Sequence, residues 1–135
     1  KKPFELEKQF MNKNNVYKIL RAKEWSKASS EGQIITELDR QDGFIHLSTA
    51  TQLPATLSFF FDDSDLLYLL QLDLEKIDFG KLIFEEPLPN IGKRRSAFPH
   101  LYSELMTDQI SHVWVIERGA FKLPEEVLLQ GENIY

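Results

Sequence analysis

The chain has 135 residues, of which 42% are hydrophobic and 27% charged, values typical of one globular domain. Its 16 basic against 21 acidic side chains give a net charge of -5, which argues against a dedicated DNA-binding protein, because a nucleic-acid backbone needs a basic footprint. With no cysteine and no apolar run long enough to span a bilayer, the chain is expected to be a soluble, cytoplasmic monomer without membrane contact or thiolate chemistry.

Composition separates only the beginning of the chain from the rest. Residues 1–15 are mainly polar and end in the loop signal NKNN, so we expect an N-terminal extension followed by a single domain over residues 16–135. The segment VYKIL at residues 16–20 is rich in strand-forming side chains and predicts the first strand. Residues 22–32 predict a helix, because alanine and tryptophan recur at helical spacing and Gly32 is placed to end it.

The following segments predict a strand, a turn, a second strand and a helix. Residues 33–38 (QIITEL) give an ambiguous short strand, and residues 39–43 (DRQDG) give a turn. Residues 44–48 (FIHLS) alternate, with the aromatic residue, the histidine and the serine on one face. Residues 49–61 predict a helix whose first turn accommodates a proline.

The second half of the chain is dominated by strands. Residues 66–73 form the longest apolar run and predict a central strand, and residues 81–86 and 110–117 predict two more. Residues 87–105 are rich in proline and charge and are expected to form a long irregular segment, of the kind that is either functional or disordered. The pattern predicts an α+β domain with a bent or split, antiparallel-rich sheet of about five or six strands and two main helices.

His46 interrupts an apolar run and is followed by the hydroxyl side chains of Ser48, Thr49 and Thr51. An imidazole and hydroxyl groups beside a helix N-terminus can line a polar cleft, and the free N–H groups there suit a phosphate or a carboxylate. The alternative is a core histidine that holds the strand-to-helix turn, with Ser48 or Thr49 capping the helix. The residues alone leave both interpretations open.

A second cluster combines cations, aromatic rings and an imidazole. Arg94 and Arg95 are followed, within a few residues, by His100 and Tyr102. Such a group could hold a phosphorylated ring compound through charge and stacking. The alternative is a solvated basic turn followed by a loop that is docked through its aromatic residues.

One carboxylate and the three histidines are the remaining candidates for catalytic or metal-binding residues. Glu85 ends a predicted strand, where it could orient a sugar hydroxyl or act as a general base, or else face solvent. His46, His100 and His112 lack the short spacing of local metal motifs, so we expect no bound metal.

Several motifs together resemble a known family. VYKIL, Trp25, DGFIHLST, Gln52 a few residues later, a phenylalanine pair and FPHLY are similar, over residues 16–117, to domain-of-unknown-function family 952, which is found mainly in bacteria. That family is grouped by fold with the ADP-ribosyltransferases, NAD-using enzymes that include the RNA 2'-phosphotransferases. The resemblance therefore implies an ADP-ribosyltransferase-like fold and NAD, or a related phosphorylated nucleotide, as a small-molecule ligand.

The resemblance also implies roles for individual residues. Lys18 stands where many relatives keep a histidine or an arginine, and His46 lies near their ring-stacking position. Their catalytic glutamate, on a late strand, corresponds by order to Glu85, with Glu117 as another candidate.

Two functions of a ligand site remain open at this point, beside a structural or interaction domain in which both histidines would be buried and paired with the backbone. The first is an NAD-dependent transferase that moves an ADP-ribosyl or a phosphate group, with His46, His100 and Glu85 as catalytic residues. The second is a non-catalytic small-molecule-binding or sensor domain. Both predict that the two imidazoles lie on the same side of the domain and open into one pocket. The ligand-binding candidates are Lys18, Ser48, Thr49, Gln52, Arg94, Arg95 and Tyr102.

Overall fold

The computed structural model describes residues 15–86, 97–117 and 124–132, so the expected extension at residues 1–15 lies, apart from Asn15, outside the described residues. The described strands are β1 (Val16–Arg21), β2 (Ile45–His46), β3 (Ser48–Thr49), β4 (Leu66–Leu72), β5 (Leu82–Glu85), β6 (Phe98–Leu101) and β7 (Ile110–Glu117). The described helices are α2 (Ala22–Glu31), α3 (Glu37–Asp42), α4 (Leu53–Phe60) and α5 (Glu125–Glu132).

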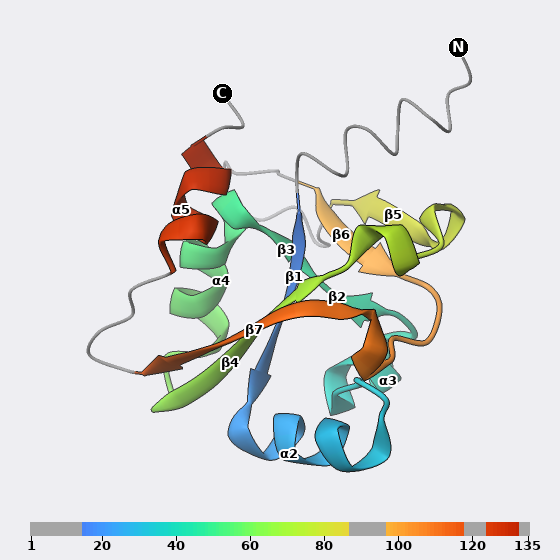
Figure 1. The fold of residues 1–135 in the computed structure, drawn as a ribbon, viewed down its shortest axis with the longest axis horizontal. Coiled ribbons are helices and arrows are strands. Elements are labelled where there is room, and N and C mark those ends of the chain that lie inside the picture. The colour runs from blue at the N-terminus through green and yellow to red at the C-terminus, as the bar shows by residue number, and fades with distance from the viewer. Residues whose placement is uncertain (1–14, 87–96, 118–123, 133–135) are drawn as a thin grey trace.

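The strands form two antiparallel sheets. One sheet has four strands in the order β3-β1-β4-β7, and the other has three in the order β2-β6-β5. Figure 1 shows β4 and β7 crossing the middle of the molecule, with α4 and α5 on one side and β5 and β6 on the other. The α+β class and the antiparallel pairing are confirmed, and β4 is central as its apolar sequence predicts.

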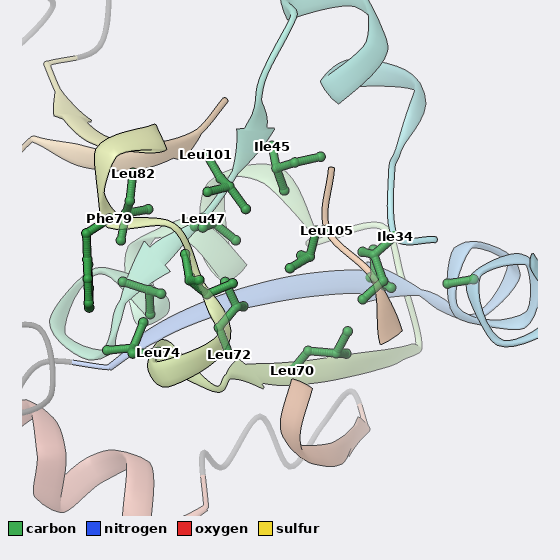
Figure 2. Close-up of a cluster of buried hydrophobic side chains, with 14 residues drawn as sticks. Ile34, Ile45, Leu47, Leu70, Leu72, Leu74, Phe79, Leu82, Leu101 and Leu105 are labelled. Atoms are coloured by element: carbon green, nitrogen blue, oxygen red, sulfur yellow. The ribbon is translucent and has the colours of Figure 1, made fainter. Parts of the chain in front are cut away.

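The first hydrophobic core fills the space between the two sheets. Figure 2 shows Leu70 and Leu72 of β4 on one side of this core, with Ile45 of β2 and Leu101 of β6 on the other. All four side chains are buried, and each such burial stabilises the fold by roughly 1.5–3 kcal/mol. This core therefore fixes β2 and β6 over the face of the larger sheet.

The second core lies on the opposite face of the larger sheet, under α4 and α5. Tyr17 and Ile19 of β1 pack there against Leu53 and Leu57 of α4 and against Val127 of α5. Because both faces of β1 and β4 are covered, their sequences are apolar almost without interruption. Lys18 is the exception in β1, and its surroundings are described with the site below.

The prediction for residues 33–43 is wrong. A helix, α3, begins after Thr36, where a short strand and then a turn were expected. Its N-terminus is closed by a capping box, in which the Thr36 side chain accepts from the Asp39 N–H and the Asp39 carboxylate accepts from the Thr36 N–H. Gly43, with φ of 85°, ends the helix in the left-handed conformation that glycine adopts without strain.

Two further predictions need correction. The expected single strand at residues 44–48 is two short strands, because the chain leaves β2 in one sheet and enters β3 in the other. The segment 87–105, expected to be irregular, contains β6. Among the described residues, none of the helices combines the length and the apolar character that crossing a bilayer requires.

Candidate functional site

His46 lies between two carboxylates. Its Nδ1 is 2.7 Å from Oδ1 of Asp39, and its Nε2 is 2.8 Å from Oδ2 of Asp42. An ionised carboxylate only accepts hydrogen bonds, so both contacts are satisfied together when each ring nitrogen carries a proton. The side chain of His46 is 29% exposed, whereas that of Asp39 is fully buried.

Asp39 is the centre of a buried polar network. Its carboxylate lies 2.8 and 3.0 Å from Nζ of Lys18 and also accepts from the backbone N–H of His46 at 3.0 Å. Burial would raise the pKa of Asp39, but the hydrogen bonds from His46 and the charge and hydrogen bonds of Lys18 hold it well below its usual range. The buried Asp39 is therefore an ionised carboxylate.

Lys18 is the buried cation of this network. Its side chain is only 4% exposed, and its ammonium also donates to the backbone carbonyl of His46 at 3.0 Å. Burial lowers the pKa of Lys18, and the attraction of Asp39 opposes that shift. Since its donors are directed at protein acceptors, Lys18 supports the strand that carries His46 and is not free to hold a phosphate.

His100 forms a second carboxylate–imidazole pair. Its Nδ1 is 2.6 Å from Oε1 of Glu85, and the hydroxyl of Tyr102 donates to the same oxygen at 2.7 Å. The hydrogen bond from His100 and then that from Tyr102 lower the pKa of Glu85, while the bond to Glu85 raises the pKa of Tyr102. Glu85 is therefore ionised and is oriented by two neighbours.

The two pairs are adjacent because their strands are. His46 of β2 is the register partner of His100 of β6, and their ring centroids are 5.7 Å apart. Phe44 packs against both rings, since the centroid of its ring is 4.0 Å from that of His100 and 4.5 Å from that of His46. The prediction that the two imidazoles lie on the same side of the domain agrees with this geometry. We call these residues, with Asp39, Asp42, Glu85 and Tyr102, the histidine cluster.

A pocket of about 560 Å³ opens beside the histidine cluster. His46 is among the residues that line this pocket and His100 is not, so one pocket shared by both imidazoles stays a prediction. The walls come from β1, α2, the start of α3, the β2–β3 segment, α4 and β6. The lining residues are Tyr17, Lys18, Ile19, Arg21, Glu24, Thr36, Glu37, Leu38, Asp39, His46, Leu47, Ser48, Thr56, Phe60, Phe61 and Phe98.

The remaining ligand-binding candidates lie in different surroundings. Ser48 is a lining residue of the pocket, and its hydroxyl is 3.3 Å from that of Thr56. Gln52 is buried and connects two segments of the chain, since its side chain accepts from the Thr49 N–H at 2.9 Å and donates to the Ala97 carbonyl at 2.8 Å. Gln52 and Thr49 do not line the pocket. Arg94 and Arg95 lie outside the described residues.

Sequence reasoning missed three members of the cluster, namely Asp39, Asp42 and Phe44. Two signals were available, because Asp42 precedes His46 by only four residues and Asp39 completes a Thr-x-x-Asp cap. The other glutamate candidate, Glu117, is exposed at the end of β7, in the sheet that does not contain the cluster. Within the described ranges no three His, Asp or Glu side chains are grouped so that they could hold a metal ion.

Comparison with other proteins gives a family and a set of similar structures. No curated protein matches the chain. The crystal structure of protein CC0527 from Caulobacter crescentus is similar, with 28% identity, a TM-score of 0.69, and coverage of 86% of this chain and 97% of that one. The solution NMR structure of CC0527 is also similar, with 29% identity, a TM-score of 0.66, and coverage of 82% and 91%. A family described as "Protein of unknown function (DUF952)" matches residues 19–113. The chain belongs to the DUF952 family.

Proposed function

We propose that the protein binds NAD or a related nucleotide at the histidine cluster and transfers its ADP-ribosyl group, with Glu85 as the carboxylate that acts on the ribose. The observation that carries this proposal is the pair of adjacent imidazoles, 5.7 Å apart, each oriented by its own carboxylate. The proposal includes the ADP-ribosyltransferase-like fold that the sequence resemblance implies.

The charges of the cluster favour breakage of a glycosidic bond over transfer of a phosphate. Asp42 and Glu85 are each 40% exposed at the surface of the cluster, beside the ionised Asp39. A transition state in which the sugar becomes cation-like is stabilised by such carboxylates. A phosphate centre gathers negative charge in its transition state and needs cations. Among the described residues, the lysine that contacts the cluster, Lys18, is already held by Asp39.

The proposed step forms one bond and breaks one. The bond between ribose C1' and the nicotinamide nitrogen breaks, and its electron pair leaves with nicotinamide. An oxygen of water or of an acceptor hydroxyl forms the new bond to C1', and its proton passes to Glu85 or His100. Glu85 suits this role because it is ionised and because His100 and Tyr102 both fix the position of its Oε1.

The proposal is tested by incubating the protein with NAD and measuring free nicotinamide. We expect release by the wild type, a loss of about a hundredfold or more in Glu85→Gln, because the charge is removed and the shape kept, and wild-type release in Glu86→Gln. Glu86 is the matched control, since it is an exposed glutamate one position further along the chain. Equal release by the wild type and Glu85→Gln would overturn the assignment of Glu85.

The second candidate is a domain that binds the nucleotide without turnover. It is favoured by the engagement of both ring nitrogens of His46, which leaves that imidazole no free nitrogen for proton transfer while Asp42 stays in place. NAD-dependent changes in the resonances of the cluster, without released nicotinamide, would support this candidate over the transferase.

A further inference from the structure

A second pocket, of about 420 Å³, lies between α3, the start of β2 and the segment that follows β6. One of its walls comes from two segments, around Ile34 and Leu105, that are joined by a backbone hydrogen bond of 2.7 Å and by an antiparallel bridge between Gln33 and Met106. Ile34 and Leu105 are buried in the first core, which fixes this wall. The volume falls within the range of about 300–1,000 Å³ that is usual for small-molecule sites.

The second pocket borders the histidine cluster and differs from the first pocket in its lining. Phe44 and Tyr102 of the cluster line it, and of the described residues only Asp39 lines both pockets. Asp39 is held by Lys18 and His46, and the hydroxyl of Tyr102 donates to Glu85. These polar groups are therefore already engaged within the protein.

Two opposite charges of the second pocket lack partners. Arg40 of α3 and Glu104, which follows β6, are exposed lining residues. Neither the guanidinium of Arg40 nor the carboxylate of Glu104 forms an ion pair or a hydrogen bond with any residue that the structure describes. Both side chains are long and have several rotatable bonds, so each can turn toward a molecule in the pocket. Such a molecule would meet one positive and one negative group.

Apolar surface lies between these charges and the histidine cluster's side of the pocket. Ile35 and Phe44 line the pocket, and neither is fully buried, so both offer part of their surface to a ligand. Ile35 packs against the first core, and the ring centroid of Phe44 is 5.3 Å from that of Tyr102. Gly43, which ends α3, also lines the pocket and has no side chain to fill it.

We infer that the second pocket binds a free α-amino acid with an apolar side chain. Its carboxylate meets Arg40, whose planar guanidinium can donate two parallel hydrogen bonds, and its ammonium meets Glu104. Its side chain lies against Ile35 and Phe44. A free amino acid carries both charges on one carbon, whereas either end of a peptide carries only one of them. The inference is independent of the proposed transfer at Glu85, because it requires neither a nucleotide nor bond breakage.

The test is an NMR titration of the full chain with L-leucine, leucinamide and N-acetyl-L-leucine. Leucinamide lacks the carboxylate and represents the first residue of a peptide, whereas N-acetyl-L-leucine lacks the ammonium and represents the last. L-leucine is expected to shift the amide resonances of Gly43 and Ser103, which line the pocket. It should bind about three- to tenfold more tightly than either analogue, the usual effect of one charged hydrogen bond at an accessible site.

Two charge variants connect each probe to one side chain. In Arg40→Gln, L-leucine should lose its advantage over leucinamide and keep its advantage over N-acetyl-L-leucine. In Glu104→Gln, it should lose the second advantage and keep the first. A general disturbance of the fold would weaken all three probes alike, so this exchange of preferences reports the two contacts themselves.

Matched controls separate these contacts from the effect of net charge. Lys23→Gln and Glu31→Gln each remove one charge from an exposed side chain of α2 that does not line the second pocket. Both variants should bind the three probes with wild-type preferences.

Three outcomes would overturn the inference: no shifts at the pocket residues with millimolar L-leucine, equal affinity for L-leucine and either analogue, or wild-type preferences in either charge variant. If L-leucine binds as described while NAD releases no nicotinamide, the pocket assignment stands and the transferase proposal fails. If nicotinamide is released and L-leucine does not bind, the proposed transfer stands and this inference fails.

Discussion

At the scale of single residues, the ion pair of Lys18 and Asp39 explains why a lysine lies in a buried strand. Two opposite charges in an apolar interior are tolerated when each is hydrogen-bonded, and here the ammonium meets the carboxylate and the His46 carbonyl. The resemblance made Lys18 a ligand-binding candidate, and Lys18 does line the pocket. Its donors are nevertheless used to position His46.

Replacement of Lys18 by methionine should therefore destabilise the protein strongly. The variant leaves the Asp39 charge buried without its cation, and loss of one partner of a buried pair typically costs about 3–5 kcal/mol. Urea denaturation measures the change in free energy of unfolding. Lys23→Met, which alters an exposed lysine of α2, is the control and should stay within about 0.5 kcal/mol of the wild type. A loss below about 1 kcal/mol in Lys18→Met would show that the pair is unimportant for stability.

Replacement of Tyr17 by phenylalanine should leave stability unchanged or increase it. The hydroxyl makes no hydrogen bond to any residue that the structure describes, so its removal should break none and should relieve the burial of a polar group, a gain of up to about 1 kcal/mol. The melting temperature without ligand reports this effect. A clear loss of stability would mean that the hydroxyl has a partner in the folded protein.

At the scale of elements, the short helix α3 organises the site. It spans Glu37–Asp42, and two of its carboxylates, Asp39 and Asp42, hold the two nitrogens of His46. A helix of this length has little intrinsic stability, so it depends on its cap and on these contacts. The Thr36 cap therefore contributes to the geometry of the histidine cluster.

Thr36→Ala should lower the free energy of unfolding by about 1 kcal/mol, the usual effect of losing an N-cap hydroxyl. The same variant should broaden or shift the imidazole resonances of His46, because Asp39 loses its capping partner. Thr36→Ser keeps the oxygen and should restore both properties. If Thr36→Ala leaves both unchanged, α3 does not depend on its cap.

The elements also show how far the sequence alone could predict this fold. Alternation correctly places Ile45 and Leu47 in the interior and His46 on the other face, because side chains of a strand alternate. It could not show that the chain changes sheets at Leu47, since that depends on which strands become neighbours. The sequence did not predict β6, because it contains Pro99, and proline lacks the N–H that a central strand normally donates.

The secondary-structure prediction for residues 33–43 was wrong for a different reason. The β-branched run of Ile34, Ile35 and Thr36 has strand propensity, whereas the helix that follows is decided by the capping box of Thr36 and Asp39. The side-chain hydrogen bonds of that box outweighed local propensity. The same error removed Asp39 and Asp42 from the predicted site.

At the scale of the whole molecule, the two sheets create the site by facing each other across one core. The smaller sheet brings His100 and Glu85 beside His46, while the pocket forms between the larger sheet, α3 and α4. Neither juxtaposition is encoded within any one segment. The sequence predicted that the histidines were close, but not that His46 would be among the residues that line the pocket and His100 would not.

Stability should fall in acid because of Asp39. The folded state holds the pKa of Asp39 below its ordinary value of 3.8, so the unfolded chain takes up this proton first as the pH falls. The contribution of Asp39 is therefore complete above about pH 5 and is lost progressively as the pH drops toward the lower pKa of the folded state. Urea midpoints measured from pH 7 to pH 3 should show this decline. Asp39→Asn, which cannot titrate, should be less stable at pH 7 and should show a shallower decline, and an equal slope in both proteins would contradict this assignment.

The central claim is that the histidine cluster binds a nucleotide, and an NMR titration with NAD tests it most directly. We expect shifts in the imidazole resonances of His46 and His100 and in the amide of Tyr102, with His112 of β7 unaffected as an internal control, since it lies in the other sheet. An absence of shifts at the cluster with millimolar NAD would contradict the claim.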